Sequence, residues 1–289
     1  MNSSTLRLSR RQLMLGATGA ALYATLPGIS AAASAQGSLA PQFTDPLEAL
    51  RAHVKLVGSL GNEQVISFYR LNIYADLNHG EFVPLMTMNN ILVDNWTVRP
   101  DGSHQMIKYE AGYYTHIDSH EPISVFRNPV NGAESKIQNF RLGPVPRGYS
   151  KDGYTVMGFH PNPLPLEVIA GRVFLATQSI ETSPSFTNPS EKRYTNSFMT
   201  YSAALEDMQN PELASAPVHA QLQNKTEWLP YMKMGDQPGG TVVRGFGGKL
   251  ENGFDSLPAG VLEQYKRQLP QILETENWTS FVSEMTDAE

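Results

Sequence analysis

The property that most limits the fold of this 289-residue chain is an alternation of side-chain type with a period of two residues. It is clearest over residues 65–74, where Val, Ser, Tyr, Leu and Ile alternate with Ile, Phe, Arg, Asn and Tyr. Successive side chains of a strand point to opposite faces, so this segment is predicted to be a strand with apolar or aromatic groups on both faces. The same reasoning predicts strands over residues 82–98, 104–115, 122–127, 136–142, 153–160, 167–181, 192–205, 218–229 and 240–250.

Segments rich in Asn, Asp and Gly separate these stretches, as at Asn78-His79-Gly80 and Asn131-Gly132, and such segments form tight turns. About ten strands joined by short turns indicate a mainly β protein built as an antiparallel meander. We expect the sheet to be barrel-like, because closure removes exposed edges and a barrel of about eight or more strands can hold a small molecule. Loops are expected at five prolines that no central strand could contain: Pro144, Pro146, Pro161, Pro163 and Pro165.

Two helices are expected, one near each end of the β-rich region. Asp45 has the properties of an N-cap and Pro46 those of a first helical residue, which predicts a helix over residues 46–57. A second helix with one apolar face is predicted over residues 256–269, just before Pro270. No repeat or linker divides the region between them, so residues 45–289 are predicted to form a single β-rich domain.

The N-terminal segment has the composition of an export signal. Arg10-Arg11 precedes an uncharged apolar stretch over residues 13–29, and Ala33-Ser34-Ala35 fits a small-residue cleavage site. The paired arginines favour a twin-arginine signal over residues 1–35, cleaved after Ala35 and followed by a spacer over 36–44. A transmembrane anchor is the alternative, which the glycines and the proline inside the apolar stretch disfavour. We therefore expect the twin-arginine export machinery as a partner, a periplasmic or secreted location, and no membrane association of the mature form.

Charge and cysteine content exclude several classes of function. The chain has 22 Lys+Arg and 28 Asp+Glu, which gives a formal net charge of −6. It therefore lacks the positive electrostatic potential that attracts nucleic acids. It has no cysteine, which excludes disulfides, thiolate metal sites, iron–sulfur clusters and a thiol nucleophile.

Several motifs resemble those of an uncharacterised bacterial family, the domain of unknown function 1838. They are Glu110-Ala-Gly-Tyr-Tyr-Thr115, Phe126-Arg-Asn-Pro129, the block Trp228–Gly239, Gly247-Gly-Lys-Leu250 and Leu257-Pro258. The resemblance covers most of residues 45–285 and implies the export signal, which members often carry, but no reaction. An acidic Asp-Pro that usually follows the Tyr-Thr motif is replaced here by His116-Ile117-Asp118.

Charged residues within the predicted strands are the main candidates for a site. Six of them are flanked by apolar or aromatic residues: Arg70, Glu110, Arg127, Arg172, Glu227 and Arg244. An isolated buried charge costs several kcal/mol, so any that face inward must be paired, which would give a polar cluster within an aromatic pocket. The alternative is that these side chains point to solvent, as Arg and Glu usually do.

From this pattern we expect an exported protein that binds a small aromatic or apolar compound carrying polar groups, as a cofactor-independent lyase or isomerase. Glu110 would be the general base or acid, and Arg70 and Arg244 would steer an anionic or carbonyl oxygen. The residues expected to contact the ligand are Tyr69, Tyr114, Arg127, Trp228 and Met232. A periplasmic binding protein with the same pocket and no chemistry is the alternative.

A metal-dependent protein is the second alternative. His116, Asp118 and His120 would face one side of a strand, where two imidazoles and a carboxylate can hold a metal. A polar turn explains the same residues, since Ser119, Glu121 and Pro122 are adjacent, and no metal or other cofactor is predicted.

Overall fold

The computed structural model describes residues 43, 45–78, 80–156, 166–184 and 190–274, within a compact unit that spans Gln36–Glu289. The predicted signal segment 1–35 and the cleavage site after Ala35 lie outside the described residues. Among the described residues, no helix has the length and apolar character needed to cross a membrane.

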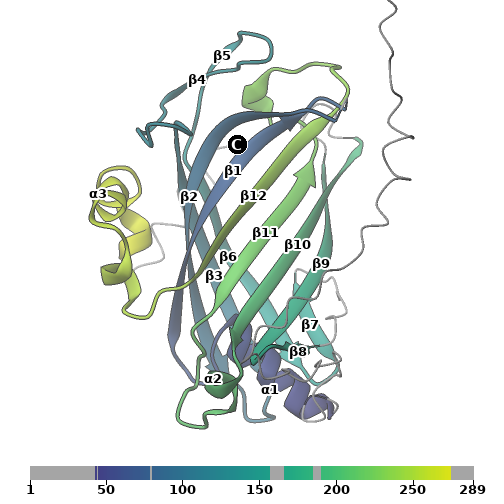
Figure 1. Cartoon of the computed structure of the whole chain (residues 1–289), viewed down its shortest axis with the longest axis vertical. Coiled ribbons are helices and arrows are strands. Elements are labelled where there is room, and N and C mark those ends of the chain that lie inside the picture. Colours follow the sequence, from purple (N-terminus) through teal and green to yellow (C-terminus); the bar gives the residue numbers. More distant parts are fainter. Residues whose placement is uncertain (1–42, 44, 79, 157–165, 185–189, 275–289) are drawn as a thin grey trace, which may run out of the picture. The chain divides into compact units, whose positions relative to one another are not determined.

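In this part of the chain, ten strands form one antiparallel sheet in the order β7-β6-β3-β2-β1-β12-β11-β10-β9-β8 (Figure 1). The strands are β1 Gln64–Asp76, β2 Phe82–Val98, β3 His104–Thr115, β6 Phe140–Ser150, β7 Gly153–Val156, β8 Glu167–Ile169, β9 Arg172–Pro184, β10 Lys192–Ala204, β11 His219–Thr226 and β12 Gly240–Lys249. A separate hairpin pairs β4 Val125–Arg127 with β5 Glu134–Lys136. The predicted mainly β, antiparallel architecture is confirmed.

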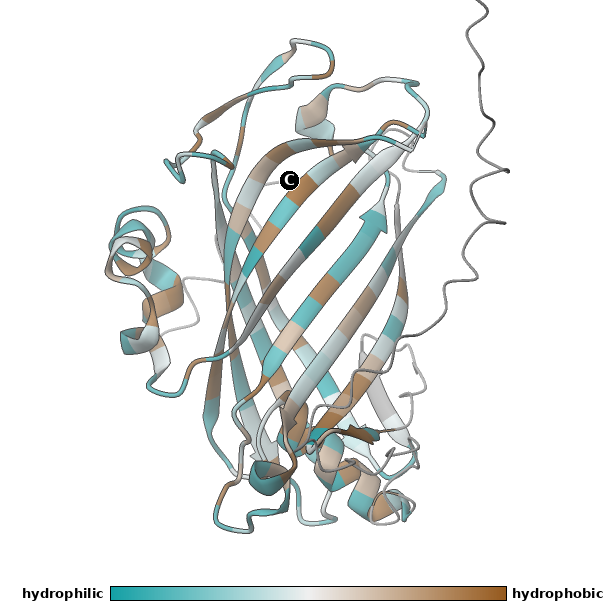
Figure 2. Ribbon diagram, in the orientation of Figure 1, coloured by the Kyte–Doolittle hydropathy of each residue, from teal (hydrophilic) through white to brown (hydrophobic). Residues whose placement is uncertain are grey.

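The first strand of the sheet pairs with the last. β1 lies between β2 and β12, and two meanders run outward from this central pair. The sheet curls into a half-barrel, and among the described residues its two edges, β7 and β8, come from the middle of the chain (Figure 1). Hydrophobic and hydrophilic residues alternate along the strands, as a sheet covered unequally on its two faces requires (Figure 2).

Helices cover one end and the convex face of the half-barrel. α1 Pro46–Val57 begins where predicted, with the Asp45 carboxylate accepting from the backbone N of Leu47 at 2.9 Å. α1 packs across one end, on inner-face residues that include Trp96 and Tyr149, and we call this the α1 end. α3 Ala259–Gln268 and the following turn η5 Pro270–Leu273 pack on the convex face, where the Tyr265 hydroxyl donates to the Asn89 carbonyl at 2.8 Å. The remaining helices are α2 Leu205–Gln209, η3 Pro230–Met232 and η4 Gly253–Ser256.

The opposite end is covered by the β4–β5 hairpin and the loop 227–239, which together we call the cap (Figure 1). Asn128 in the hairpin donates through Nδ2 to the Met232 carbonyl at 2.7 Å, and Lys233 Nζ donates to the Glu134 carbonyl at 2.7 Å. These bonds join two segments about one hundred residues apart in sequence, so the cap is a built element and not two independent loops.

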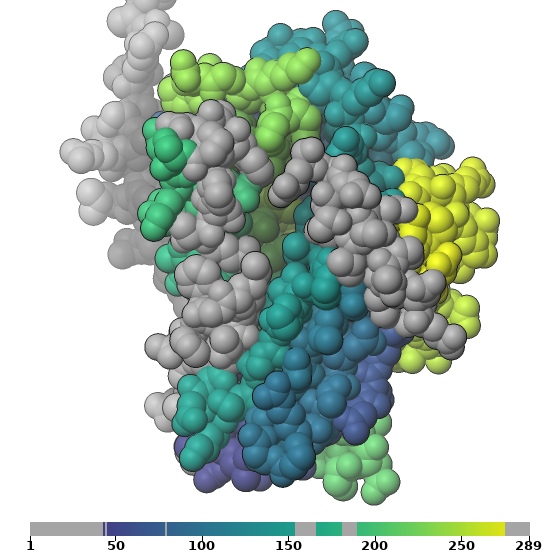
Figure 3. Space-filling model, turned by 180° about the vertical axis from the view of Figure 1, so that it is seen from behind, coloured from purple at the N-terminus to yellow at the C-terminus, as the bar shows by residue number. Residues whose placement is uncertain are grey.

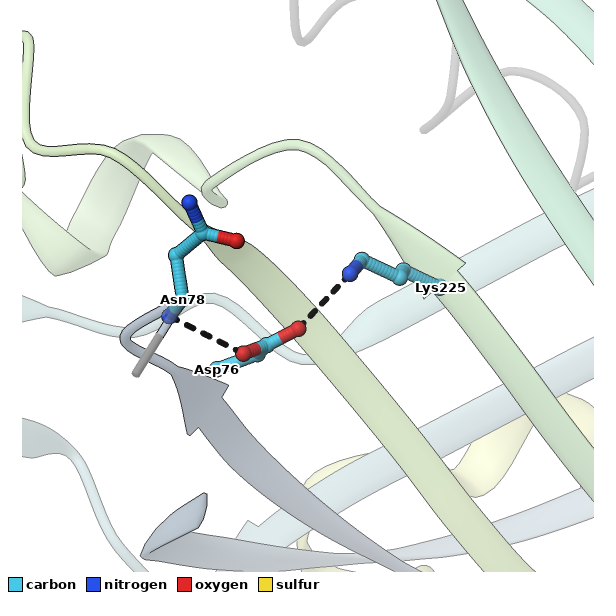
Figure 4. A network of polar contacts seen from close by, with 3 residues as sticks. All are labelled: Asp76, Asn78 and Lys225. Atoms are coloured by element: carbon cyan, nitrogen blue, oxygen red, sulfur yellow. Dashed lines mark hydrogen bonds and ion pairs between the residues drawn. The ribbon is translucent and has the colours of Figure 1, made fainter. Parts of the chain in front are cut away.

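A charged contact ties strands together near the cap. Lys225 on β11 reaches across β12 to Asp76 at the end of β1, with Nζ 2.7 Å from Oδ2, and the Asn78 backbone N donates to the other oxygen at 3.0 Å (Figure 4). The hydrogen bond from Lys225 lowers the pKa of Asp76 below its usual value.

The prediction of loops at Pro144 and Pro146 is wrong, because both prolines lie within β6. Pro146 is the partner of Ile107 on β3, and Pro144 lies where the β3–β6 register shifts between Lys108 and Glu110. A strand tolerates proline at such an irregularity of the ladder.

Candidate active site on the concave face

The strand register defines which side chains point into the half-barrel. Direct partners in neighbouring strands share a face, so the row that contains Asp94 continues through Lys108 on β3 and Val65 on β1. Two residues further along β3, Glu110 lies opposite Leu92. Arg147 on β6 and Lys249 on β12 lie on the same inner face. We call these charged residues the interior cluster: Asp94, Lys108, Glu110, Arg147 and Lys249.

Within the cluster, Glu110 has its oxygens engaged. It forms an ion pair with Lys108, and the Asn90 side chain donates to its other oxygen at 2.6 Å. Lys108 and Glu110 are two residues apart on one strand, so the β period itself places them side by side. This pairing meets the requirement that a buried charge be neutralised by a neighbour.

Asp94 is in a different position, because one oxygen of its buried carboxylate lacks a hydrogen bond among the described residues. Its Oδ1 has no partner among the described residues, and only 6% of the residue is exposed. Burial raises the pKa of Asp94 to about 6, against the opposing effect of Lys108 and Arg147. A carboxyl group with such a pKa is populated in both protonation states near neutral pH, which suits a general acid or base.

Arg147 approaches Asp94 from β6. A hydrogen bond joins its guanidinium to Tyr149, while its Nε has no partner among the described residues. Burial opposes the charge, but Tyr149, Asp94 and Tyr201 outweigh it and raise the pKa of Arg147. Tyr201 lies on β10, so groups on opposite walls of the half-barrel act on one another across the interior.

Lys249 connects the cluster to α1. Its Nζ donates to the Lys55 and Gly58 carbonyls at 2.9 and 2.6 Å and to the Ser215 hydroxyl at 2.9 Å. Burial lowers the pKa of Lys249 to about 7, although Asp94 acts in the opposite direction. Because its three protons are used, Lys249 positions the end of α1 and is not free to bind a ligand.

Aromatic rings lie beside the charges. The Tyr69 ring on β1 packs against Gly247, where an added Cβ would lie 2.0 Å from the Phe68 carbonyl oxygen and 2.8 Å from the Tyr69 ring. Only glycine permits this close approach. At the α1 end, the Trp96 and Tyr149 rings pack with their centroids 4.9 Å apart and their planes tilted by 33°. Seen from behind, a hollow opens beside β6, and atoms coloured as β12 are visible in its depth (Figure 3).

The structure brings together some of the sequence-predicted residues and separates others. Glu110, Tyr69 and Tyr114 all lie on the inner face. Arg70 lies on the opposite face, because it is adjacent to Tyr69 in a strand, and it donates to Asn89 Oδ1 at 3.3 Å. Arg244 pairs with Asn72 on that convex face and is exposed, so neither arginine reaches Glu110.

Three further predicted residues lie in or near the cap. Arg127 is exposed on β4, whereas Trp228 and Met232 are buried in an apolar cluster that also includes Tyr114. Trp228 Nε1 donates to the Gln237 carbonyl at 2.7 Å. Trp228 and Met232 therefore hold the cap, and through Tyr114 they contact the inner face.

The candidate metal ligands occupy an exposed turn after β3. His116, Asp118 and His120 do not continue the strand, and the His120 backbone N donates to the His116 carbonyl at 3.1 Å. Within the described ranges, no group of three His, Cys, Asp or Glu side chains is placed to hold a metal ion.

Sequence reasoning missed four of the five residues of the interior cluster. Lys108 could have been found, because it lies two residues before Glu110 on a predicted strand. Asp94 follows three apolar residues, a signal that the segment is buried on both faces. Arg147 lies among prolines that hid its strand, and Lys249 lies in the motif Gly247–Leu250, to which the family resemblance assigns no role.

Comparison with known proteins gives a family but no activity. No curated protein matches the sequence. The family model described as "Protein of unknown function (DUF1838)" matches residues 62–288, which include every strand of the sheet and both segments of the cap. The chain therefore belongs to the DUF1838 family.

Proposed function

We propose that the concave face binds a small molecule and exchanges a proton with it, as a cofactor-independent lyase or isomerase. The observation that carries this proposal is Asp94: a buried carboxyl group with an unpartnered oxygen, on the same inner face as Arg147, whose charge acts on it and whose Nε also lacks a partner among the described residues. A fold optimised only for stability would pair or replace these groups, because each unpartnered buried polar atom costs about 1–3 kcal/mol.

The proposed chemistry uses the two groups in different ways. The Asp94 carboxylate removes a proton from a carbon next to a carbonyl group, and the Arg147 guanidinium donates to the carbonyl oxygen as negative charge develops there. In an isomerase Asp94 returns the proton to another atom of the substrate. In a lyase the electron pair instead expels a leaving group, and the proton is passed on to it or to solvent.

The remaining groups give the site its shape. Glu110 and Asn90 hold Lys108 in place beside Asp94, so that one cation faces the carboxylate. The rings of Tyr69 and Tyr201 and the side chains of Leu71 and Leu222 offer apolar surface for the body of a ligand.

Deuterium exchange tests the proposal without knowledge of the natural substrate. A panel of aromatic and alicyclic ketones is incubated with the protein in heavy water, and deuterium at the carbon next to the carbonyl is followed by NMR. The wild-type protein should accelerate exchange for at least one ketone, and Asp94→Asn should lose at least about 100-fold of that rate. Arg244→Ala, on the convex face, should leave it unchanged. Binding of ketones without any exchange would instead support the binding-protein alternative.

We also propose that the protein is exported through the twin-arginine route, on the evidence of Arg10-Arg11, the apolar stretch and Ala33-Ser34-Ala35. Cell fractionation should recover a periplasmic or secreted form that begins at Gln36. Replacement of Arg10 and Arg11 by lysine should leave the uncleaved precursor in the cytoplasm. A cytoplasmic wild-type protein that retains residues 1–35 would contradict this proposal.

A further inference from the structure

A second group of polar side chains lies on the other wall of the half-barrel. Ser179 on β9 is the direct partner of Ser197 on β10, which is in turn the partner of Asn224 on β11. These residues form a row across three neighbouring strands on the inner face, and we call it the polar row.

The polar row contains a buried acceptor without a partner. Asn224 Oδ1 is buried and has no hydrogen bond among the described residues. In the next row toward the cap, Thr195 and Thr226 bond to each other at 3.0 Å. Thr195 and Thr226 therefore satisfy one another, whereas the buried Asn224 Oδ1 in the polar row is left open.

The row lies within reach of the interior cluster. Tyr201 is four residues from Ser197 on the same face of β10, about 13 Å along the strand, and it acts on both Tyr69 and Arg147. The strands are tilted (Figure 1), so a row that crosses the sheet at right angles to them runs obliquely around the wall. Between Tyr201 and the row, Met199 and Leu222 form an apolar surface.

We infer that the polar row binds a neutral hydroxyl or carbonyl group of the ligand, at the end opposite to the one that Asp94 and Arg147 act on. The ligand class is then a flat or elongated apolar molecule with an oxygen function at each end. Serine hydroxyls and an amide carry no net charge and both donate and accept, which matches a neutral oxygen rather than an ion. The inference rests on the proposed function, because it assumes that the other end of the ligand lies at the interior cluster.

Two probes that differ by one hydroxyl test the inference. The first is an acetylnaphthalene, and the second is its analogue with a hydroxyl at the far end of the ring system. Calorimetry should show that the wild-type protein binds the hydroxylated probe about tenfold more tightly, because a site built for a hydroxyl leaves polar groups unpaired when the hydroxyl is absent. Asn224→Leu and Ser197→Ala should each reduce this preference to about twofold or less while retaining the affinity for the parent ketone.

Matched controls lie on the same strands. Gln223→Ala on β11 and Thr200→Ala on β10 alter the outer face and should keep the full preference. If Asn224→Leu fails to fold, Ser197→Ala alone still decides the result, since it removes only a hydroxyl. Equal binding of the two probes by the wild-type protein, or a preference that persists in both inner-face variants, would overturn the inference.

Failure of the inference and of the proposed function give different results. If the parent ketone binds and Asp94→Asn or Arg147→Met alters that binding, but the added hydroxyl has no effect, the proposed function stands and the inference is wrong. If neither probe binds the wild-type protein, both are contradicted.

Discussion

Burial of the ionised Asp94 carboxylate lowers the free energy of unfolding at the pH values where this carboxylate could act as a base. Its pKa is 3.8 in the absence of burial and about 6 in the folded protein, so between these values the native state holds more protons than the unfolded state. The free energy of unfolding therefore decreases as the pH rises through this window and does not recover above it.

Asp94→Asn should accordingly stabilise the protein above about pH 6 while removing activity. The expected gain in the free energy of unfolding is on the order of 3 kcal/mol at neutral pH and near zero below pH 3.8, where the carboxyl group is protonated in both states. Urea unfolding at both ends of this range measures it. An equal gain at both would show that charge is not the cause.

Asp76 should show the opposite dependence on pH. Its pKa is lowered in the folded protein by Lys225, so its stabilising effect is complete above its ordinary value and is lost as the pH falls through the lowered one. Since Lys225 is largely exposed, we expect Asp76→Asn to cost less than about 1 kcal/mol near neutral pH. The cost, measured by thermal unfolding, should disappear in acid; a cost that stays constant would point to the Asn78 backbone contact.

At the scale of elements, one side chain links the C-terminal end of α1 to β12. Lys249→Met would remove the three hydrogen bonds that its Nζ donates to the Lys55 and Gly58 carbonyls and to the Ser215 hydroxyl. We expect a loss of about 2–4 kcal/mol in the free energy of unfolding, and faster amide exchange in α1 than in β2 or β3. Lys225→Met is the matched control, and a comparable loss there would contradict this role.

Local patterns fixed the elements well where each strand carries its own signal. α1, β2 and β3 begin and end at the residues expected, because a capping Asp, a sustained period of two and Gly-containing turns mark them. The strand predicted over residues 136–142 covers only the start of β6 Phe140–Ser150, because Pro144 and Pro146 predict a loop. Element boundaries thus depend on position in the sheet, which no single segment encodes.

The site was less predictable than the elements, for a geometric reason. Glu110 and Tyr69 were placed on the inner face, but the expected partner Arg70 is adjacent to Tyr69 and must point the other way. Asp94 and Arg147 approach one another only through the register of β2, β3 and β6. Such convergence is a property of the assembled sheet.

At the scale of the whole described unit, the junction of β1 with β12 joins the two meanders, and Gly247 lies within it. Gly247→Ala should disrupt the unit, because the new Cβ would lie 2.0 Å from the Phe68 carbonyl oxygen. We expect a loss of more than about 3 kcal/mol, seen as a lower unfolding temperature and a low soluble yield. Gly148→Ala in β6, where a Cβ meets no atom within 4 Å, should be tolerated.

The central position of the β1–β12 pair also sets the order of events during synthesis. β1 leaves the ribosome long before its second neighbour, β12, so the nascent chain carries an unsatisfied strand until β12 is made. Assembly must therefore wait until β12 has been translated, and a chain truncated before residue 240 would expose β1 to pairing with other chains.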